Sequence, residues 1–195
     1  MSMKSIIGGL LLSVSLTCQA IEISTENSEK SELETVELLN VLRKAHNISK
    51  WEFTNKVHIK RKTIPHSHPI LTLNTRHTSK EQKDLLLSTY IHEQIHWHLD
   101  NNESKTNTAI EELKSVFKNA PVGYPEGARD EHSTYLHLLV CYLELEAITE
   151  LLSQSRVNSV AKFWQGDHYT WIYKQIAKEK EILKNIVEKY GLKIV

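Results

Sequence analysis

The stretch TYIHEQIHWH (residues 89–98) places two histidines, His92 and His96, four residues apart. The chain from about Lys80 to Leu99 contains no proline and has apolar residues with which a helix can pack. On a helix, side chains four residues apart lie on one face, so both imidazoles can bind the same ion. Zinc accepts imidazole nitrogen readily, and a catalytic zinc site keeps one position for water. The stretch therefore predicts a metal-binding helix.

Glu93 adds a chemical function to this helix. It directly follows the first histidine, which places its carboxylate beside the ion without making it a ligand. There it can accept a proton from water and later pass that proton to a leaving amine. His98 lies round the helix from His96 and is predicted to point away from the ion. A helix that carries surface histidines is the alternative interpretation.

These ten residues resemble the motif helix of the zincin superfamily of metallopeptidases. The resemblance implies a zinc ion (Zn²⁺) held by His92 and His96, with Glu93 as the general base. It extends more loosely to the order of strand and helix over residues 70–99. In zincins an edge strand before the motif helix binds extended substrate by β-pairing, and residues 70–74 are the matching segment.

The third metal ligand distinguishes the branches of this superfamily. Metzincins carry a histidine six residues after the second one, but this chain has Asn102 there and no glycine before it. Gluzincins instead take a glutamate from a later helix, so the resemblance is to a gluzincin-like branch. We favour Glu131, at the start of a predicted long helix. His137, deeper in that helix, is the second candidate and Glu126 the third.

Other polar residues allow two interpretations. His137 and Glu144 share one face of a strongly apolar predicted helix, where buried polar groups need partners. They either belong to the metal site, with the carboxylate orienting a histidine, or form a hydrogen-bonded pair in the core. Zincins commonly use a histidine or tyrosine to stabilise an oxyanion, and the resemblance offers His168 or Tyr169 for that catalytic role. The alternative there is a helix N-terminus with aromatic packing.

The wider pattern predicts an α+β fold, a single mostly helical domain with a small sheet. Residues 56–60 and 70–74 have the composition and alternation of strands, whereas the polar residues 21–30 are predicted as a loop. We expect residues 21–195 to form one zincin-like metallohydrolase domain. The predicted helices cover residues 32–46, 80–99, 108–118, 130–152, 155–163 and 167–191.

Residues 1–20 are predicted to be a signal peptide. Lys4 precedes a short apolar run, and Cys18 and Ala20 are small residues at the positions that a signal peptidase inspects. Cleavage after Ala20 is favoured over a lipid anchor on Cys18, because the residue before that cysteine is not glycine, alanine or serine. We therefore expect export to the periplasm or beyond, without a membrane span. Cys141 is then the only cysteine, predicted to be a buried hydrophobe.

These expectations combine into a function. The 24 Lys and Arg residues balance the 24 Asp and Glu residues, which gives no sign of a nucleic-acid partner. The sequence predicts an exported zinc-dependent hydrolase, a metallopeptidase or amidase acting on a peptide or another amide substrate. The alternative is a non-catalytic exported domain that keeps the motif helix for metal binding or for interaction.

Overall fold

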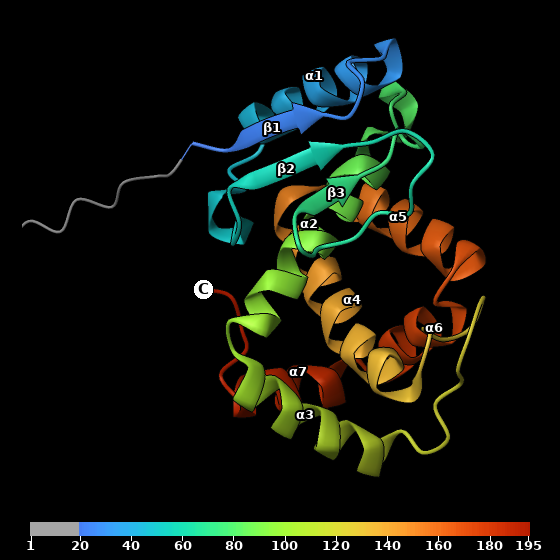
Figure 1. Cartoon of the computed structure of the whole chain (residues 1–195). Coiled ribbons are helices and arrows are strands. Elements are labelled where there is room, and N and C mark those ends of the chain that lie inside the picture. Colours follow the sequence, from blue (N-terminus) through green and yellow to red (C-terminus); the bar gives the residue numbers. More distant parts are fainter. Residues whose placement is uncertain (1–19) are drawn as a thin grey trace, which may run out of the picture.

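A computed structural model describes residues 20–195, with a small sheet beside a larger group of helices (Figure 1). The predicted class, a mostly helical α+β single domain, is confirmed. Residues 1–19, which hold most of the predicted signal peptide, lie outside the described residues. The strands are β1 (Glu22–Thr25), β2 (Lys56–Ile59) and β3 (Leu71–Leu73). The helices are α1 (Lys30–Ala45), α2 (Lys83–Asp100), α3 (Glu103–Val116), α4 (Glu131–Leu151), α5 (Gln154–Asp167), α6 (Thr170–Lys178) and α7 (Lys180–Lys189), and two short 3-10 helices are η1 (Ser49–Trp51) and η2 (Lys80–Gln82).

The three strands are parallel and lie in the order β1-β2-β3. The strands β2 and β3 fall where the sequence predicted them, but β1 lies in the segment predicted as a loop. Ile23 pairs with Val57 of β2 and packs against the core from its partly buried position. The polar residues of β1 thus find backbone partners in a neighbouring strand, which the composition of the segment does not reveal.

The strand β3 forms one edge of the sheet, where the zincin resemblance implied pairing with substrate. At Thr72 this expectation is wrong, because the chain itself occupies the edge. His66 exchanges two backbone hydrogen bonds with Thr72, with N–O distances of 3.0 and 2.8 Å. The segment that makes this contact is the β2–β3 loop (residues 60–70), and it covers the outer side of β3 there.

The same loop is also attached to the motif helix α2. The indole N–H of Trp97 donates to the backbone oxygen of Ser67 at 2.9 Å. The indole ring stacks on His68, with the two ring centroids 4.1 Å apart. The β2–β3 loop is therefore fixed to α2.

The centre of the molecule is the contact between α2 and α4 (Figure 1). The helix α2 also touches α1, α3, α5 and the sheet, so it is buried on most sides. Its apolar residues Leu87, Tyr90, Ile91 and Ile95 are fully buried. A helix surrounded in this way needs apolar residues all round, which is why its sequence carries no single apolar stripe. The motif histidines thus project from a rigidly packed element.

Several helix boundaries differ from the prediction. The helix α3 starts five residues earlier than expected, α5 extends to Asp167, and the predicted final helix is two helices that meet at Glu179. The apolar spacing continues across that junction, so the sequence pattern could not show the break. Among the described residues, no helix has the length and apolar composition needed to cross a membrane.

Candidate metal centre

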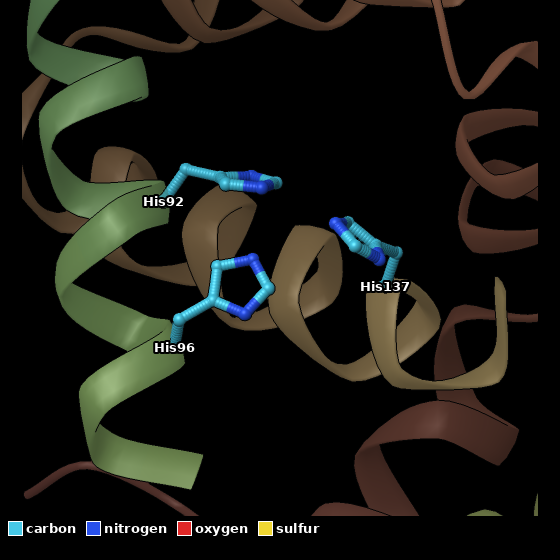
Figure 2. Close-up of side chains that lie close together, drawn as sticks. All are labelled: His92, His96 and His137. Carbon is cyan, nitrogen blue, oxygen red and sulfur yellow. The ribbon is translucent and has the colours of Figure 1, made fainter. Parts of the chain in front are cut away.

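Three imidazole rings meet between α2 and α4. Figure 2 shows His92 and His96, one turn apart on α2, pointing toward His137 of α4. A candidate ligand atom of each ring lies within 4.8 Å of one on both others. Three nitrogens bound at about 2.1 Å in a tetrahedral zinc site lie roughly 3.4 Å apart. Small side-chain rotations would therefore bring these three nitrogens onto one ion.

The hydrogen bonds of two rings decide which nitrogens are free. The Nδ1 atom of His92 lies 3.0 Å from a carboxylate oxygen of Glu144, and that of His137 lies 2.7 Å from the backbone oxygen of Ser133. Both oxygens can only accept, so in each ring Nδ1 carries a proton and donates. A metal ion bound by these two rings would therefore use Nε2.

Glu144 is the polar centre behind the histidines. Its side chain is almost fully buried and accepts hydrogen bonds from His92, from the Ser88 hydroxyl and from the Tyr173 hydroxyl, the last at 2.9 Å. Ser88 in turn accepts from the Trp164 indole at 2.8 Å. These contacts distinguish the two interpretations of His137 and Glu144. Glu144 is hydrogen-bonded to His92 and not to His137, as expected of a carboxylate that orients a histidine and not of a hydrogen-bonded pair of these two residues.

The environment of the rings affects their protonation. Burial, with the neighbouring His92 charge adding to it, lowers the pKa of His137 to about 3 and that of His96 well below its ordinary value. Burial also opposes a charge on His92, but hydrogen bonds to Cys141 and Glu144 outweigh it and raise the pKa of His92. His96 and His137 are thus neutral at pH 7, the form of histidine that binds a metal ion, whereas His92 is charged and would release its Nε2 proton when it binds one.

Glu93 follows His92 on α2 and lies in a nearly dry position. Its exposed fraction is 6%, and it lines the same cleft as His92. Burial raises the pKa of the Glu93 carboxyl group to about 7, while the charge of His92 opposes the shift. A carboxyl group that exchanges its proton near neutral pH is suited to general acid–base work.

The structure distinguishes among the predicted third ligands. His137, the second candidate, is the residue brought to His92 and His96. Glu131, the favoured candidate, is exposed on the first turn of α4, and Glu126 is exposed in the preceding loop, so neither joins the group. The helix α4 crosses α2 nearly two turns after it begins, which places His137 and not Glu131 at the crossing.

Tyr169 contacts the third imidazole directly. Its hydroxyl lies 3.0 Å from Nε2 of His137, and because that nitrogen carries no proton, the hydroxyl donates. Burial raises the pKa of Tyr169, so the hydroxyl keeps its proton. The backbone of Tyr169 has φ +53°, a left-handed conformation that is uncommon outside glycine and that is found repeatedly at functional sites.

His168 lies next to Tyr169 and is held differently. Its Nδ1 atom lies 2.8 Å from Asp167, whose carboxylate also forms two hydrogen bonds with Arg76. Burial lowers the pKa of His168, so the ring is neutral with its proton on Nδ1. The Nε2 atom of His168 can then accept a hydrogen bond but cannot donate one.

A cleft of about 660 Å³ opens over these residues, within the usual size of a ligand site. Its floor includes His92, Glu93 and Tyr169. The β2–β3 loop and the α3–α4 loop (residues 117–130) both contribute to its walls. The cleft is therefore formed by segments that are far apart in the sequence.

Several contributors could not be identified from the sequence. Ser88 and Tyr173 looked like ordinary helix residues, yet both bond Glu144. Cys141, predicted as a buried hydrophobe, is fully buried and forms a second close group with His92 and Glu144. The spacing of positions 137, 141 and 144 on one helix face was the available signal. His66 and His68 of the β2–β3 loop and His98 of α2 do not belong to the group of His92, His96 and His137, and His98 donates to the backbone oxygen of Leu192 at 2.8 Å.

Comparison with known proteins assigns no family to this chain. No protein-family model, no curated protein and no solved structure matches it. The function is therefore argued from the residues of the site.

Proposed function

We propose that this protein is an exported zinc-dependent hydrolase, a zincin-type peptidase or amidase that uses water to cleave an amide bond. One observation carries the proposal: three imidazoles converge, and one of them, His92, lines a cleft together with the buried Glu93. The zincin-like stretch at residues 89–98 supports the reaction class. The signal-peptide pattern at residues 1–20 supports export.

The donor set fits a divalent metal ion. Two of the rings have Nδ1 bonded to the protein, so an ion would bind at Nε2 of His92, which gives up its proton, and at Nε2 of His137, which gives up its hydrogen bond from Tyr169; His96 completes the set. A bound zinc ion supplies a water of pKa about 7 and polarises a substrate carbonyl. Imidazole also suits copper and nickel, so the metal content of the purified protein is a necessary measurement.

The residues around the ion have separate roles in this proposal. Glu93 accepts a proton from the attacking water and delivers it to the leaving amine nitrogen. Tyr169 donates its hydroxyl hydrogen bond to the oxyanion, and it suits that role better than His168, whose Nε2 lacks a proton. Glu144 keeps His92 oriented, since it receives the Nδ1 proton.

Replacing Glu93 with glutamine tests the mechanism. We expect Glu93→Gln to retain about one equivalent of zinc by elemental analysis and to lose hydrolysis of a quenched-fluorescent peptide mixture by about 10²–10⁴-fold. The matched control is Glu131→Gln, because Glu131 is exposed and outside the metal group. It should retain both zinc and activity.

The same experiment addresses the alternative function. Wild-type protein that binds zinc through His92 and His96 but hydrolyses no peptide or amide would identify a non-catalytic metal-binding domain. Unchanged hydrolysis in Glu93→Gln would rule out the proposed mechanism. Loss of zinc in His92→Ala, measured separately, tests the ligand assignment itself.

A further inference from the structure

Two large apolar side chains stand at the mouth of the cleft. Ile64 is 83% exposed and Tyr124 is 81% exposed, and both line the cleft that contains Glu93. Ile64 belongs to the β2–β3 loop and Tyr124 to the α3–α4 loop, two separate segments that both contribute to its lining. A single exposed apolar residue is ordinary, but two that share a cleft with a candidate catalytic carboxylate indicate a binding surface.

The backbone around Tyr124 keeps the ring exposed. Within its loop, Gly123 donates to the backbone oxygen of Ala128 at 2.7 Å, and Gly127 donates to that of Gly123 at 2.9 Å. The backbone oxygen of Pro125 accepts from Thr170 at 3.0 Å, at the N-terminus of α6. These bonds flank Tyr124 on both sides, so the loop conformation itself presents the ring to solvent.

Ile64 is held in a similar way. The backbone oxygen of Thr63 accepts from the Asn74 side chain at 3.1 Å, and that of Ile64 accepts from the ring of His66 at 2.9 Å. Since both apolar side chains sit on hydrogen-bonded loops, a ligand finds them already in place. Such preorganisation reduces the entropy that binding must overcome.

The charges of the cleft restrict what can lie between these residues. Among the described residues that line it, three carry carboxyl groups: Glu93 is buried, Asp167 is engaged by Arg76, and Glu144 is enclosed by its donors. The exposed charge at the mouth is the guanidinium of Arg129, which pairs only with the neighbouring Asp130 at 3.1 Å. A basic substrate side chain would find no exposed, unpaired carboxylate among the described lining residues and would meet the positive charge of Arg129.

We propose that the cleft takes peptides in which a large apolar side chain adjoins the scissile bond, seated between Ile64 and Tyr124, and that it disfavours lysine or arginine at that position. This inference rests on the proposed function, because it assigns the substrate class of the same site. It goes further by making the two loops, and not the metal centre, the determinants of specificity.

Quenched-fluorescent peptides that differ at one residue, Phe, Leu, Ala, Glu or Lys, test the proposal on the zinc-loaded protein. We expect kcat/KM for the Phe and Leu peptides to exceed that for the Ala peptide by about 10-fold or more, from burial of the added apolar surface. The Lys peptide should fall below the Ala peptide. Mass spectrometry of the products identifies the bond that is cleaved.

Matched variants connect the preference to the two side chains. In Ile64→Ser and Tyr124→Ser the ratio of kcat/KM for the Phe and Ala peptides should fall toward 1. Val41→Ser removes an apolar side chain that is 54% exposed on α1, outside the cleft, and should keep the wild-type ratio. A preference for Lys, or a Phe preference that both cleft variants retain, would overturn the inference.

Binding to Glu93→Gln separates this inference from the proposed function. That variant turns over no substrate in the proposed mechanism, so fluorescence anisotropy of labelled peptides reports binding alone. If the Phe peptide binds more tightly than the Lys peptide, and Tyr124→Ser weakens that binding, the apolar site between Ile64 and Tyr124 is supported even where hydrolysis fails. Equal affinity for the Phe and Lys peptides contradicts it, as does a dimer in light scattering that Ile64→Ser and Tyr124→Ser dissociate.

Discussion

Glu144 is the residue on which the orientation of the site most depends. A carboxylate removed from water is costly unless hydrogen bonds compensate for the lost hydration. Here the Ser88 and Tyr173 hydroxyls and the His92 ring provide those bonds. Because the bond to His92 fixes the position of its proton, Glu144 orients this candidate ligand from behind.

A change of this carboxylate should therefore alter metal affinity. Glu144→Gln removes the charge and one of the two acceptor oxygens, and we expect zinc to bind about 10–100-fold more weakly. Competition with a chromophoric chelator measures the effect. Glu146→Gln is the control, since Glu146 lies on the same helix but pairs with Lys180 at the surface. Equal affinities in the two variants would contradict the assigned role.

At this scale the sequence predicts pairs that are close along the chain and misses those that are not. The spacing of His92 and His96 within one helix identified them, and Glu93 followed from its place between them. The choice between Glu131 and His137 depends on where α4 crosses α2, a tertiary property. The left-handed backbone of Tyr169 has the same origin, and no residue pattern announced it.

At the scale of the elements, the α3–α4 loop has no regular secondary structure, yet hydrogen bonds and close packing hold it against α4. Thr134 of α4 donates to the backbone oxygen of Pro121 at 2.9 Å and accepts from the backbone of Ala128 at the same distance. Gly127 lies so close to Pro121 that a Cβ atom there would overlap its carbonyl oxygen. The loop therefore requires glycine at position 127 for space.

Two glycine substitutions distinguish the effect of this close contact from the general effect of replacing glycine with alanine. We expect Gly127→Ala to lower the free energy of unfolding by about 1–3 kcal/mol, because the backbone must move to admit the methyl group. In Gly166→Ala the added Cβ meets nothing within 4 Å on α5, so its stability should equal or slightly exceed that of the wild type. Urea denaturation measures both, and equal losses would show that the close contact is not limiting.

The helices and strands that the sequence predicts are those with a pattern that is local in the sequence, and those it misses depend on the tertiary structure. The strands β2 and β3 and the long helices were found because their residues carry local periodicity. The strand β1 and the break at Glu179 were missed, since the first needs a distant partner and the second interrupts a continuous apolar pattern.

Over the whole molecule, α5 is fastened near both of its ends to the segment that leads into and begins α2. Arg156 forms two hydrogen bonds with Asp84, at 2.8 and 2.5 Å, near the start of α5. Arg76 does the same with Asp167 at its end, at 2.9 and 2.5 Å. The first pair joins α2 to α5, and the second joins the segment after β3 to α5 across the cleft that both of its residues line, so the second should maintain the width of the cleft.

The second pair gives stability a dependence on pH. Hydrogen bonds from Arg76 lower the pKa of Asp167 to about 2, so the folded state holds this proton less tightly than the unfolded chain. The stabilisation is thus complete above about pH 4 and is lost as the pH falls toward 2. Arg76→Gln should lower the free energy of unfolding by about 1 kcal/mol at pH 7, with a smaller difference at pH 3. Urea titrations at both pH values measure this, and a constant difference would contradict it.

The stacking of Trp97 on His68 gives the protein an optical reporter. The indole belongs to the motif helix, whereas the imidazole belongs to the β2–β3 loop that carries Ile64. Fluorescence from an indole changes when its stacked neighbour moves. The difference in emission between the wild type and Trp97→Phe therefore records, without any added dye, whether that wall of the cleft stays in place when a peptide enters.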